Sequence, residues 1–197
     1  MLIDLIRPAT PADAEAIARL VNLAYRPLEQ GDDAVPPGWT HECDLLSGAR
    51  ISATQVHDIL VETDSVVLLG LQGTEPVACV HVRKDGQNAS IGMLAVNPRH
   101  QGLGLGKQML DLAERFALEH YSAQQFIMSV VCERPELMAF YLRRGYRPTG
   151  TVLEYPLKAG VGQPKRAGLM VEILGKLSSN VPGRATILNL NSRVIDR

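Results

Sequence analysis

A glycine-rich stretch at residues 96–107 has the composition of an anion-binding loop. It leaves an apolar run, passes through a polar turn and enters an amphipathic segment that begins Gly102-Leu103-Gly104-Leu105-Gly106-Lys107. Glycine lets a backbone approach a ligand closely and adopt positive φ. Unpaired N–H groups at a helix start, together with the helix dipole, favour an anion there. These residues therefore predict a pyrophosphate site.

Three phosphate-binding patterns compete for this loop. A P-loop needs a longer gap between its glycines, and Gln108 stands where its Ser or Thr would bind magnesium. A dinucleotide fingerprint needs a third glycine where Lys107 stands, and no repeated βαβ unit precedes it. The third pattern, [QR]-x-x-G-x-[GA], is satisfied by Gln101, Gly104 and Gly106.

The loop resembles the acyl-CoA pyrophosphate loop of the GNAT acetyltransferases. Three further segments carry the same resemblance. Residues 91–98 (Ile-Gly-Met-Leu-Ala-Val-Asn-Pro) resemble the family's fourth strand and its exit, and residues 140–146 (Phe-Tyr-Leu-Arg-Arg-Gly-Tyr) resemble its late aromatic motif. Residues 6–13 resemble its opening. The resemblance spans about residues 3–175.

The resemblance implies an α/β fold, with a twisted six- to seven-stranded mixed sheet flanked by helices and splayed between its fourth and fifth strands. It implies acetyl-CoA as co-substrate, with a backbone N–H near Leu94 facing the thioester oxygen. The implied cofactor-binding residues are Leu94, Ala95, Val96, Gln101, Gly102, Leu103, Gly104, Leu105, Gly106 and Lys107. The sequence departs from the family at Arg134, where members often carry an asparagine that contacts the cofactor.

Two residues are predicted to be catalytic. Tyr141 matches the family tyrosine beside the reacting sulfur, and a phenol is protonated at neutral pH, so it can act as general acid. Acyl transfer also needs a neutral amine, and the expected fourth strand supplies no carboxylate base. Glu42 is the predicted base, with His41, His81 and Glu133 as the other candidates.

The sequence leaves the acceptor open. The loop at residues 29–44 holds five acidic residues and no lysine or arginine, so with Trp39 it would suit a cationic, partly apolar amine. A solvated acidic loop around one packed tryptophan explains it equally well. The predicted function is transfer of acetyl from acetyl-CoA to a primary amine by direct attack in a ternary complex. The alternative is a non-catalytic acyl-CoA-binding sensor on the same fold.

The elements that would position these residues follow from hydrophobic periodicity and end signals. Ser52 with Gln55 forms a capping box before a short helix, Lys84-Asp85-Gly86 is a hairpin signal, and Gly145 suits a helix end. The expected strands are 2–6, 66–71, 77–82, 91–96, 126–131, 146–155 and 169–174, and the expected helices begin near residues 10, 52, 104 and 135. Residues 158–168 are expected to form a basic connection.

The chain as a whole suits one catalytic domain. Its 197 residues carry a net charge of −1, which gives no sign of a nucleic-acid or membrane-surface partner. Three cysteines, an odd number, predict reduced thiols and a cytoplasmic location, and no signal peptide or metal-ligand spacing is evident. We assign residues 1–177 to the acetyltransferase domain. Residues 178–197 form an extension, either an extra strand or a loosely ordered tail, and a homodimer is left open.

Overall fold

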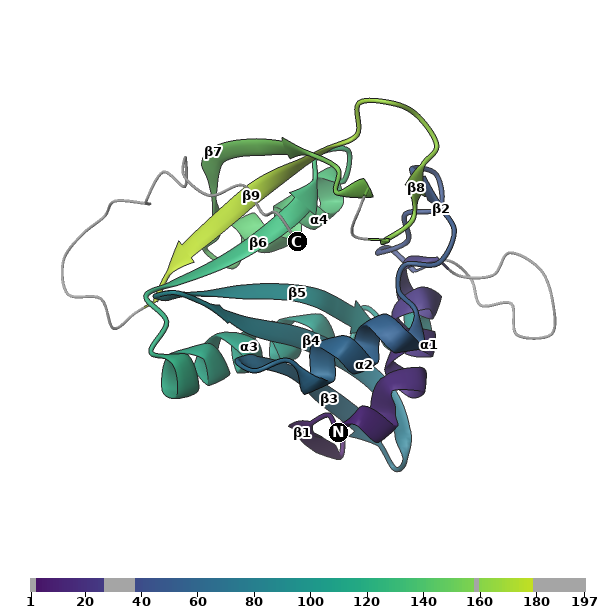
Figure 1. The fold of residues 1–197 in the computed structure, drawn as a ribbon, viewed down its shortest axis with the longest axis vertical. Coiled ribbons are helices and arrows are strands. Elements are labelled where there is room, and N and C mark those ends of the chain that lie inside the picture. Colours follow the sequence, from purple (N-terminus) through teal and green to yellow (C-terminus); the bar gives the residue numbers. More distant parts are fainter. Residues whose placement is uncertain (1–2, 27–37, 158–159, 179–197) are drawn as a thin grey trace.

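A seven-stranded mixed sheet in the order β1-β3-β4-β5-β6-β9-β7 forms the centre of the molecule (Figure 1). The computed structural model describes residues 3–26, 38–157 and 160–178. Neighbouring strands are antiparallel except β5 and β6, which pair in parallel. The strands are β1 Leu5–Pro8, β3 Ser65–Gln72, β4 Glu75–Asp85, β5 Asn88–Val96, β6 Gln125–Val131, β7 Arg147–Glu154 and β9 Met170–Leu177. The predicted mixed sheet is confirmed.

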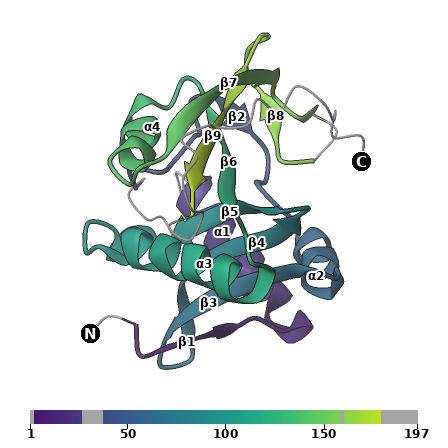
Figure 2. The same ribbon diagram turned by 90° about the vertical axis from the view of Figure 1, so that its left-hand side faces the viewer.

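Helices cover both faces of this sheet. α1 and α2 pack on one face of the β3–β5 region, and α3 crosses the opposite face (Figure 2). The helices are α1 Ala14–Tyr25, α2 Ala53–Val61, α3 Leu105–Tyr121 and α4 Pro135–Leu142, with 3-10 turns η1 Pro11–Asp13 and η2 Pro98–His100. The layered arrangement explains why the central strands are continuously apolar, since neither face is open to water.

The sheet has a hydrophobic core on each face, and alternate residues of the central strands belong to different cores. Leu68 and Val80 lie in the core that contains Met109 of α3, whereas Leu69 and Cys79 lie in the core under α1 and α2. Successive side chains of a strand point to opposite faces, so one apolar run supplies both cores. The strands that carry the site are therefore fixed from both sides.

Local end signals are confirmed where the structure describes them. Gln55 N donates to Ser52 Oγ at 3.1 Å, and Ser52 N donates to Gln55 Oε1 at 2.9 Å, which completes the capping box of α2. Gly86 has φ +60° in the β4–β5 turn, and Gly145 has φ +88° after α4. Positive φ is easily adopted only by glycine, so both turns depend on that residue type.

Two expectations differ from the structure in detail. The first strand begins at Leu5 rather than at residue 2. Two-residue strands β2 Leu46–Ser47 and β8 Gln163–Pro164 pair with each other, whereas the sequence predicted only a connection at residues 158–168 and no strand at residues 46–47. A two-residue strand has no periodicity to read. β9 is the last strand along the described chain and ends at Leu177. Of the extension predicted at residues 178–197, as an extra strand or a loose tail, only Ser178 lies within the described residues.

Candidate active site

The site begins where the sheet opens. β5 and β6 pair only at residues 88–90 with 125–127, and beyond that point the two strands diverge (Figure 1). Residues 91–92 and 95–96 still pair with β4 along their other edge, but no described strand pairs with the edge that faces β6. An unpaired strand edge offers N–H and C=O groups to an extended ligand.

A bulge distorts β5 next to this opening. Cys79 pairs with Ala95 and His81 pairs with Gly92, so β5 holds one more residue than β4 over the same span. Met93 has φ +48°, an uncommon value for a residue with a side chain. Tyr25 donates its hydroxyl to the Leu94 carbonyl at 2.7 Å and ties α1 to the bulge. Bulges re-aim backbone groups, and this one does so at the mouth of the opening.

The glycine loop joins β5 to α3 through two left-handed turns. Gly102 has φ +78° and Gly104 has φ +84°, and a Cβ built on either would meet no atom within 4 Å. Gly104 caps α3, whose first intrahelical bond runs from Gln108 N to Gly104 O. The amides of residues 105–107 are therefore free of intrahelical partners. The loop presents a helix start that accepts an anion.

A pocket of about 230 Å³ joins the glycine loop to α4. Its lining is Trp39, Thr40, Leu94, Val96, His100, Gln101, Gly102, Gly104, Leu105, Gly106, Lys107, Leu137, Phe140, Tyr141 and Arg144. Eight of the ten residues predicted to bind the cofactor are in that lining. The other two are Ala95, which is buried in the core under α1, and Leu103, which is 55% exposed.

Gln101 holds the pocket wall in place. Its Nε2 donates to Thr40 Oγ1 at 2.9 Å and to Val96 O at 3.1 Å, and its Oε1 accepts from Trp39 N at 3.0 Å. A Cβ on Gly38 would displace the Gln101 side-chain amide, so a larger residue there would disturb the bonds to Trp39 N and Thr40 Oγ1. The glutamine of the motif thus anchors the segment that precedes Glu42.

Five residues of the lining were not predicted as site residues, namely Thr40, His100, Leu137, Phe140 and Arg144, and Trp39 was considered only for the acceptor. The Trp39 and Phe140 rings lie 5.4 Å apart, and the Arg144 guanidinium lies 3.4 Å from the centre of the Phe140 ring. Arg144 follows Tyr141 by three residues, so the helical spacing of the aromatic motif was the signal that could have found it.

Tyr141 lies in the pocket wall on α4. Its side chain is only 7% exposed and stacks edge-on between Phe140 and Tyr146. Burial raises the pKa of the Tyr141 phenol, and the nearby Tyr25 adds to the shift. Its hydroxyl forms no hydrogen bond with any described residue. A phenol in this setting stays protonated and available to a ligand.

Comparison with known proteins identifies the family. A family model described as the acetyltransferase (GNAT) family matches residues 28–146, more than half of the chain. The chain belongs to this family. Membership of this family implies acetyl transfer, and the pocket lies at the glycine loop that carries the family resemblance. A search of curated proteins finds no match.

Solved structures show the same fold. The chain is similar to the ribosomal-protein-S18-alanine N-acetyltransferase of Escherichia coli, with 16% identity, 93% of this chain and 99% of that chain covered, and a TM-score of 0.64. It is also similar to a GNAT-family acetyltransferase of Streptococcus pneumoniae, with 17% identity, 88% and 98% coverage and a TM-score of 0.59. At these identities the likeness supports the fold alone.

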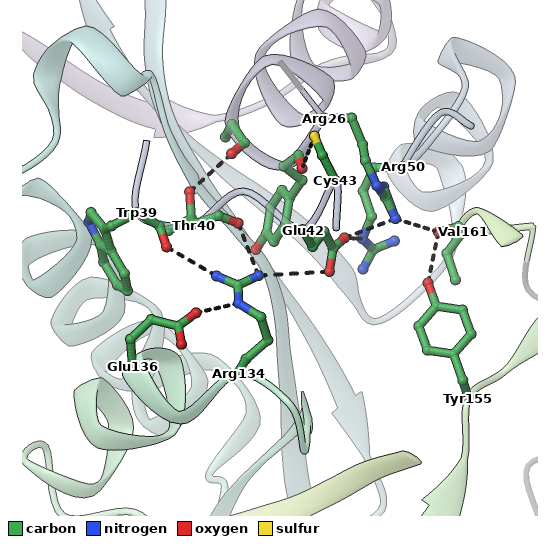
Figure 3. A network of polar contacts seen from close by, with 12 residues as sticks. Arg26, Trp39, Thr40, Glu42, Cys43, Arg50, Arg134, Glu136, Tyr155 and Val161 are labelled. Carbon is green, nitrogen blue, oxygen red and sulfur yellow. Dashed lines mark hydrogen bonds and ion pairs between the residues drawn. The ribbon is translucent and has the colours of Figure 1, made fainter. Parts of the chain in front are cut away.

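Glu42, the predicted base of this GNAT acetyltransferase, lies outside the pocket in a cluster of arginines (Figure 3). Its side chain is 6% exposed. Its Oε1 lies 3.1 Å from Arg26 Nη2 and 3.7 Å from Arg50 Nε, and its Oε2 lies 3.9 Å from Arg134 Nη1. An acceptor amine would have to compete with three guanidinium groups for this carboxylate.

Arg134 spans the opening from the β6 side. It caps α4 and donates to Thr40 O and Trp39 O, each at 3.1 Å, while its Nε bonds the Glu136 carboxylate (Figure 3). The guanidinium is 5% exposed. The residue that replaces the family asparagine therefore links α4 to the segment after α1, a role that the sequence did not reveal.

The other base candidates lie in different surroundings. His81 is removed from the pocket, its Nε2 lies 2.9 Å from Ser65 Oγ, and burial lowers its pKa to about 4. Glu133 pairs with Arg166 at 3.5 Å. His41 has a buried Nδ1 with no hydrogen-bond partner among the described residues. None of the three lines the pocket.

Metal-binding clusters and membrane-spanning helices are both absent from the described residues. No group of three or more His, Cys, Asp or Glu side chains in the described ranges is arranged to hold a metal ion. No helix within those ranges is long and apolar enough to cross a membrane. Glu29, Asp32 and Asp33 of the acidic loop lie outside the described residues, so the cationic-acceptor interpretation of that loop is untested.

Proposed function

We propose that this GNAT acetyltransferase moves an acetyl group from acetyl-CoA to a primary amine in the cytoplasm, by direct attack in a ternary complex. The observation that carries the proposal is one pocket with a helix start at one end and, in its wall, a tyrosine whose hydroxyl bonds no described residue. These are the two features that a bound thioester needs: an anion site for the carrier and a proton donor for the leaving group.

The anion end of the pocket is built from backbone and charge together. In the proposal, the amides of residues 105–107 bind the pyrophosphate, since the helix dipole and free N–H groups point at it. Lys107 and Arg144 line the same pocket and supply positive charge. Arg144 already donates to Phe140 O at 2.6 Å, which fixes its guanidinium, and its buried Nε has no partner among the described residues.

The bulge in β5 is the second part of the proposed active site. Acetyl-CoA brings an acyl group activated as a thioester. We propose that an N–H near Leu94 donates to the thioester oxygen, where negative charge develops as the amine attacks. Tyr25 holds the Leu94 carbonyl and with it the backbone of the bulge. Donors fixed before the reaction stabilise that charge without having to reorganise.

Tyr141 completes the proposal as general acid. A thiolate leaves more readily when its sulfur receives a proton. Burial keeps the Tyr141 phenol protonated, and its hydroxyl is not committed to another described residue. The general-base role of Glu42 remains a prediction, and its three arginine partners favour a positioning role instead.

Ligand-dependent thermal stability tests the cofactor assignment. Acetyl-CoA or CoA at 100 times its dissociation constant adds about 2.7 kcal/mol to the free energy of unfolding, and ATP and NAD add nothing. Stabilisation by ATP without stabilisation by CoA would remove the basis of the proposal. An acceptor screen that follows release of CoA thiol then separates the acetyltransferase from the non-catalytic sensor. Binding of acetyl-CoA without turnover of any amine would favour the sensor.

A further inference from the structure

The arginine cluster beside the pocket carries more positive charge than the described residues neutralise. Arg26, Arg50 and Arg134 gather around one carboxylate, Glu42, and Arg134 has Glu136 as a second partner (Figure 3). Three cations and two anions leave a single positive charge. Buried charge is unfavourable unless it is paired, so this site suits one further anion.

Arg26 is the buried part of that excess. Its side chain is 8% exposed, and Nη2 alone contacts Glu42 and, at 3.3 Å, the Val161 carbonyl. Its Nε and Nη1 are buried and have no hydrogen-bond partner among the described residues. A guanidinium presents five N–H donors in a fixed plane, so two of its three nitrogens remain to be satisfied. Unsatisfied buried donors point to an acceptor that binds there.

Arg50 is the accessible part. It is 25% exposed, and its guanidinium stands 5.6 Å from the centre of the Tyr25 ring. Its nearest carboxylate oxygen is Glu42 Oε1 at 3.7 Å, beyond hydrogen-bond distance, and its side chain donates to no described residue. A ligand can therefore reach Arg50 from solvent and extend toward Arg26.

The cluster lies beside the reacting end of the pocket. Tyr25 and Arg26 are consecutive residues at the end of α1. Tyr25 reaches the Leu94 carbonyl in the pocket wall, and Arg26 reaches Glu42. An acceptor whose amine lies near Leu94 and Tyr141 has its other end on the side of the arginines.

We propose that the acceptor is an amine that also carries a carboxylate, and that Arg50 and Arg26 bind this carboxylate. That the other end of the ligand is an amine rests on the proposed acetyl transfer. A singly charged planar carboxylate matches both the single excess charge and the flat donor array of guanidinium groups. With its carboxylate bound by the arginines, the acceptor directs the amine at its opposite end toward the thioester.

Matched ligand pairs test the proposal. We would measure equilibrium binding of a panel of L-amino acids and dipeptides, each beside its own carboxamide, to the full chain saturated with CoA. At least one acid should bind about 10- to 100-fold more tightly than its amide, as expected for a charge-assisted hydrogen bond. Turnover of the same pairs with acetyl-CoA should show the preference in KM rather than in kcat.

Two variants and one control locate the preference. Arg50→Gln should bring the acid and amide of that pair to within a few-fold of each other, while CoA affinity stays unchanged. Arg26→Lys keeps the buried charge but loses the planar set of donors, so it should also weaken the preference. It is the variant to use if Arg50→Gln fails to fold. Arg19→Gln removes an arginine that is 69% exposed and pairs only with Glu15 among the described residues, so the preference should survive.

The outcomes separate this inference from the proposed function. If no acid in the panel binds more tightly than its amide, or if the preference persists in both Arg50→Gln and Arg26→Lys, the carboxylate site is wrong, even where other amines are acetylated. If acids bind through Arg50 but are never acetylated, the carboxylate site stands and the proposed transfer to amines is the part that fails.

Discussion

Replacing Tyr141 by phenylalanine removes one proton donor and keeps the aromatic ring. The ring packs edge-on against Phe140 and Tyr146 at centroid distances of 5.1 and 5.8 Å, and phenylalanine preserves both contacts. The hydroxyl forms no hydrogen bond with any described residue, so its loss leaves no buried partner unsatisfied. We expect the free energy of unfolding to change by less than about 1 kcal/mol.

Catalysis should change far more than stability. A general acid contributes roughly 10²- to 10⁴-fold, equivalent to about 3–5 kcal/mol in the activation barrier. We therefore expect kcat to fall by that factor in Tyr141→Phe while the affinity for acetyl-CoA stays within about twofold. Because burial raises the pKa of this phenol, wild-type kcat should not lose the contribution of Tyr141 until the pH exceeds about 10.

Steady-state kinetics with a validated acceptor, from pH 7 to 9.5, measure both effects. Tyr146→Phe is the matched control, because Tyr146 is fully buried and lies outside the pocket lining, and it should keep kcat within about threefold. If Tyr141→Phe retains wild-type kcat throughout that range, Tyr141 is not the acid, and solvent would have to protonate the sulfur.

Three further substitutions test other parts of the molecule. Gly104→Glu should abolish CoA binding, because its carboxylate repels the pyrophosphate. The control Gly104→Ala carries the same backbone strain of about 1–2 kcal/mol and should still bind CoA. Equal CoA affinities of the two variants by calorimetry would mean that charge at this position is irrelevant. Glu42→Gln removes the carboxylate that three guanidinium groups share and should lower the free energy of unfolding by about 3–5 kcal/mol. An unchanged free energy of unfolding together with a lowered kcat would instead favour the general-base prediction. Burial depresses the pKa of His81 to about 4, so its contribution to stability is complete above about pH 6.5 and is lost as the pH falls toward 4. Urea denaturation should show wild type losing about 2 kcal/mol relative to His81→Gln between pH 7 and 4.5, and parallel curves would contradict the assigned burial.

Features encoded by neighbours in the chain were predictable from the sequence. The capping box of α2 depends on two residues three positions apart, and the glycine loop depends on a strand end, a turn and a helix start that follow one another. In both cases the physical cause lies within about ten residues, so a single sequence contains it. The two small strands β2 and β8 had no such signal, because each exists only through the other, more than a hundred residues away.

The surroundings of Glu42 show the same limit at the candidate site. Read along the chain, Glu42 belongs to an acidic loop without a basic residue, which suggested an acceptor of positive charge. In the folded protein its partners come from the end of α1, from the segment before α2 and from the start of α4. Ion pairs with residues distant in the chain place positive charge around Glu42 itself, and neither composition nor periodicity records them.

The parting of β5 and β6 also bears on how cooperatively the protein unfolds. The ladder between the two parts of the sheet consists of three residue pairs at one end, and Arg134 bridges the other end, so the unit of β6, β7, β9 and α4 has few backbone bonds to the rest. Such units open with a free energy below that of global unfolding. A ligand that lies along β5 and contacts α4 would add the missing connection, and the opening of the whole unit would then cost the binding free energy as well. Amide hydrogens of β6 and β9 would exchange more slowly in its presence, even at residues that the ligand never touches.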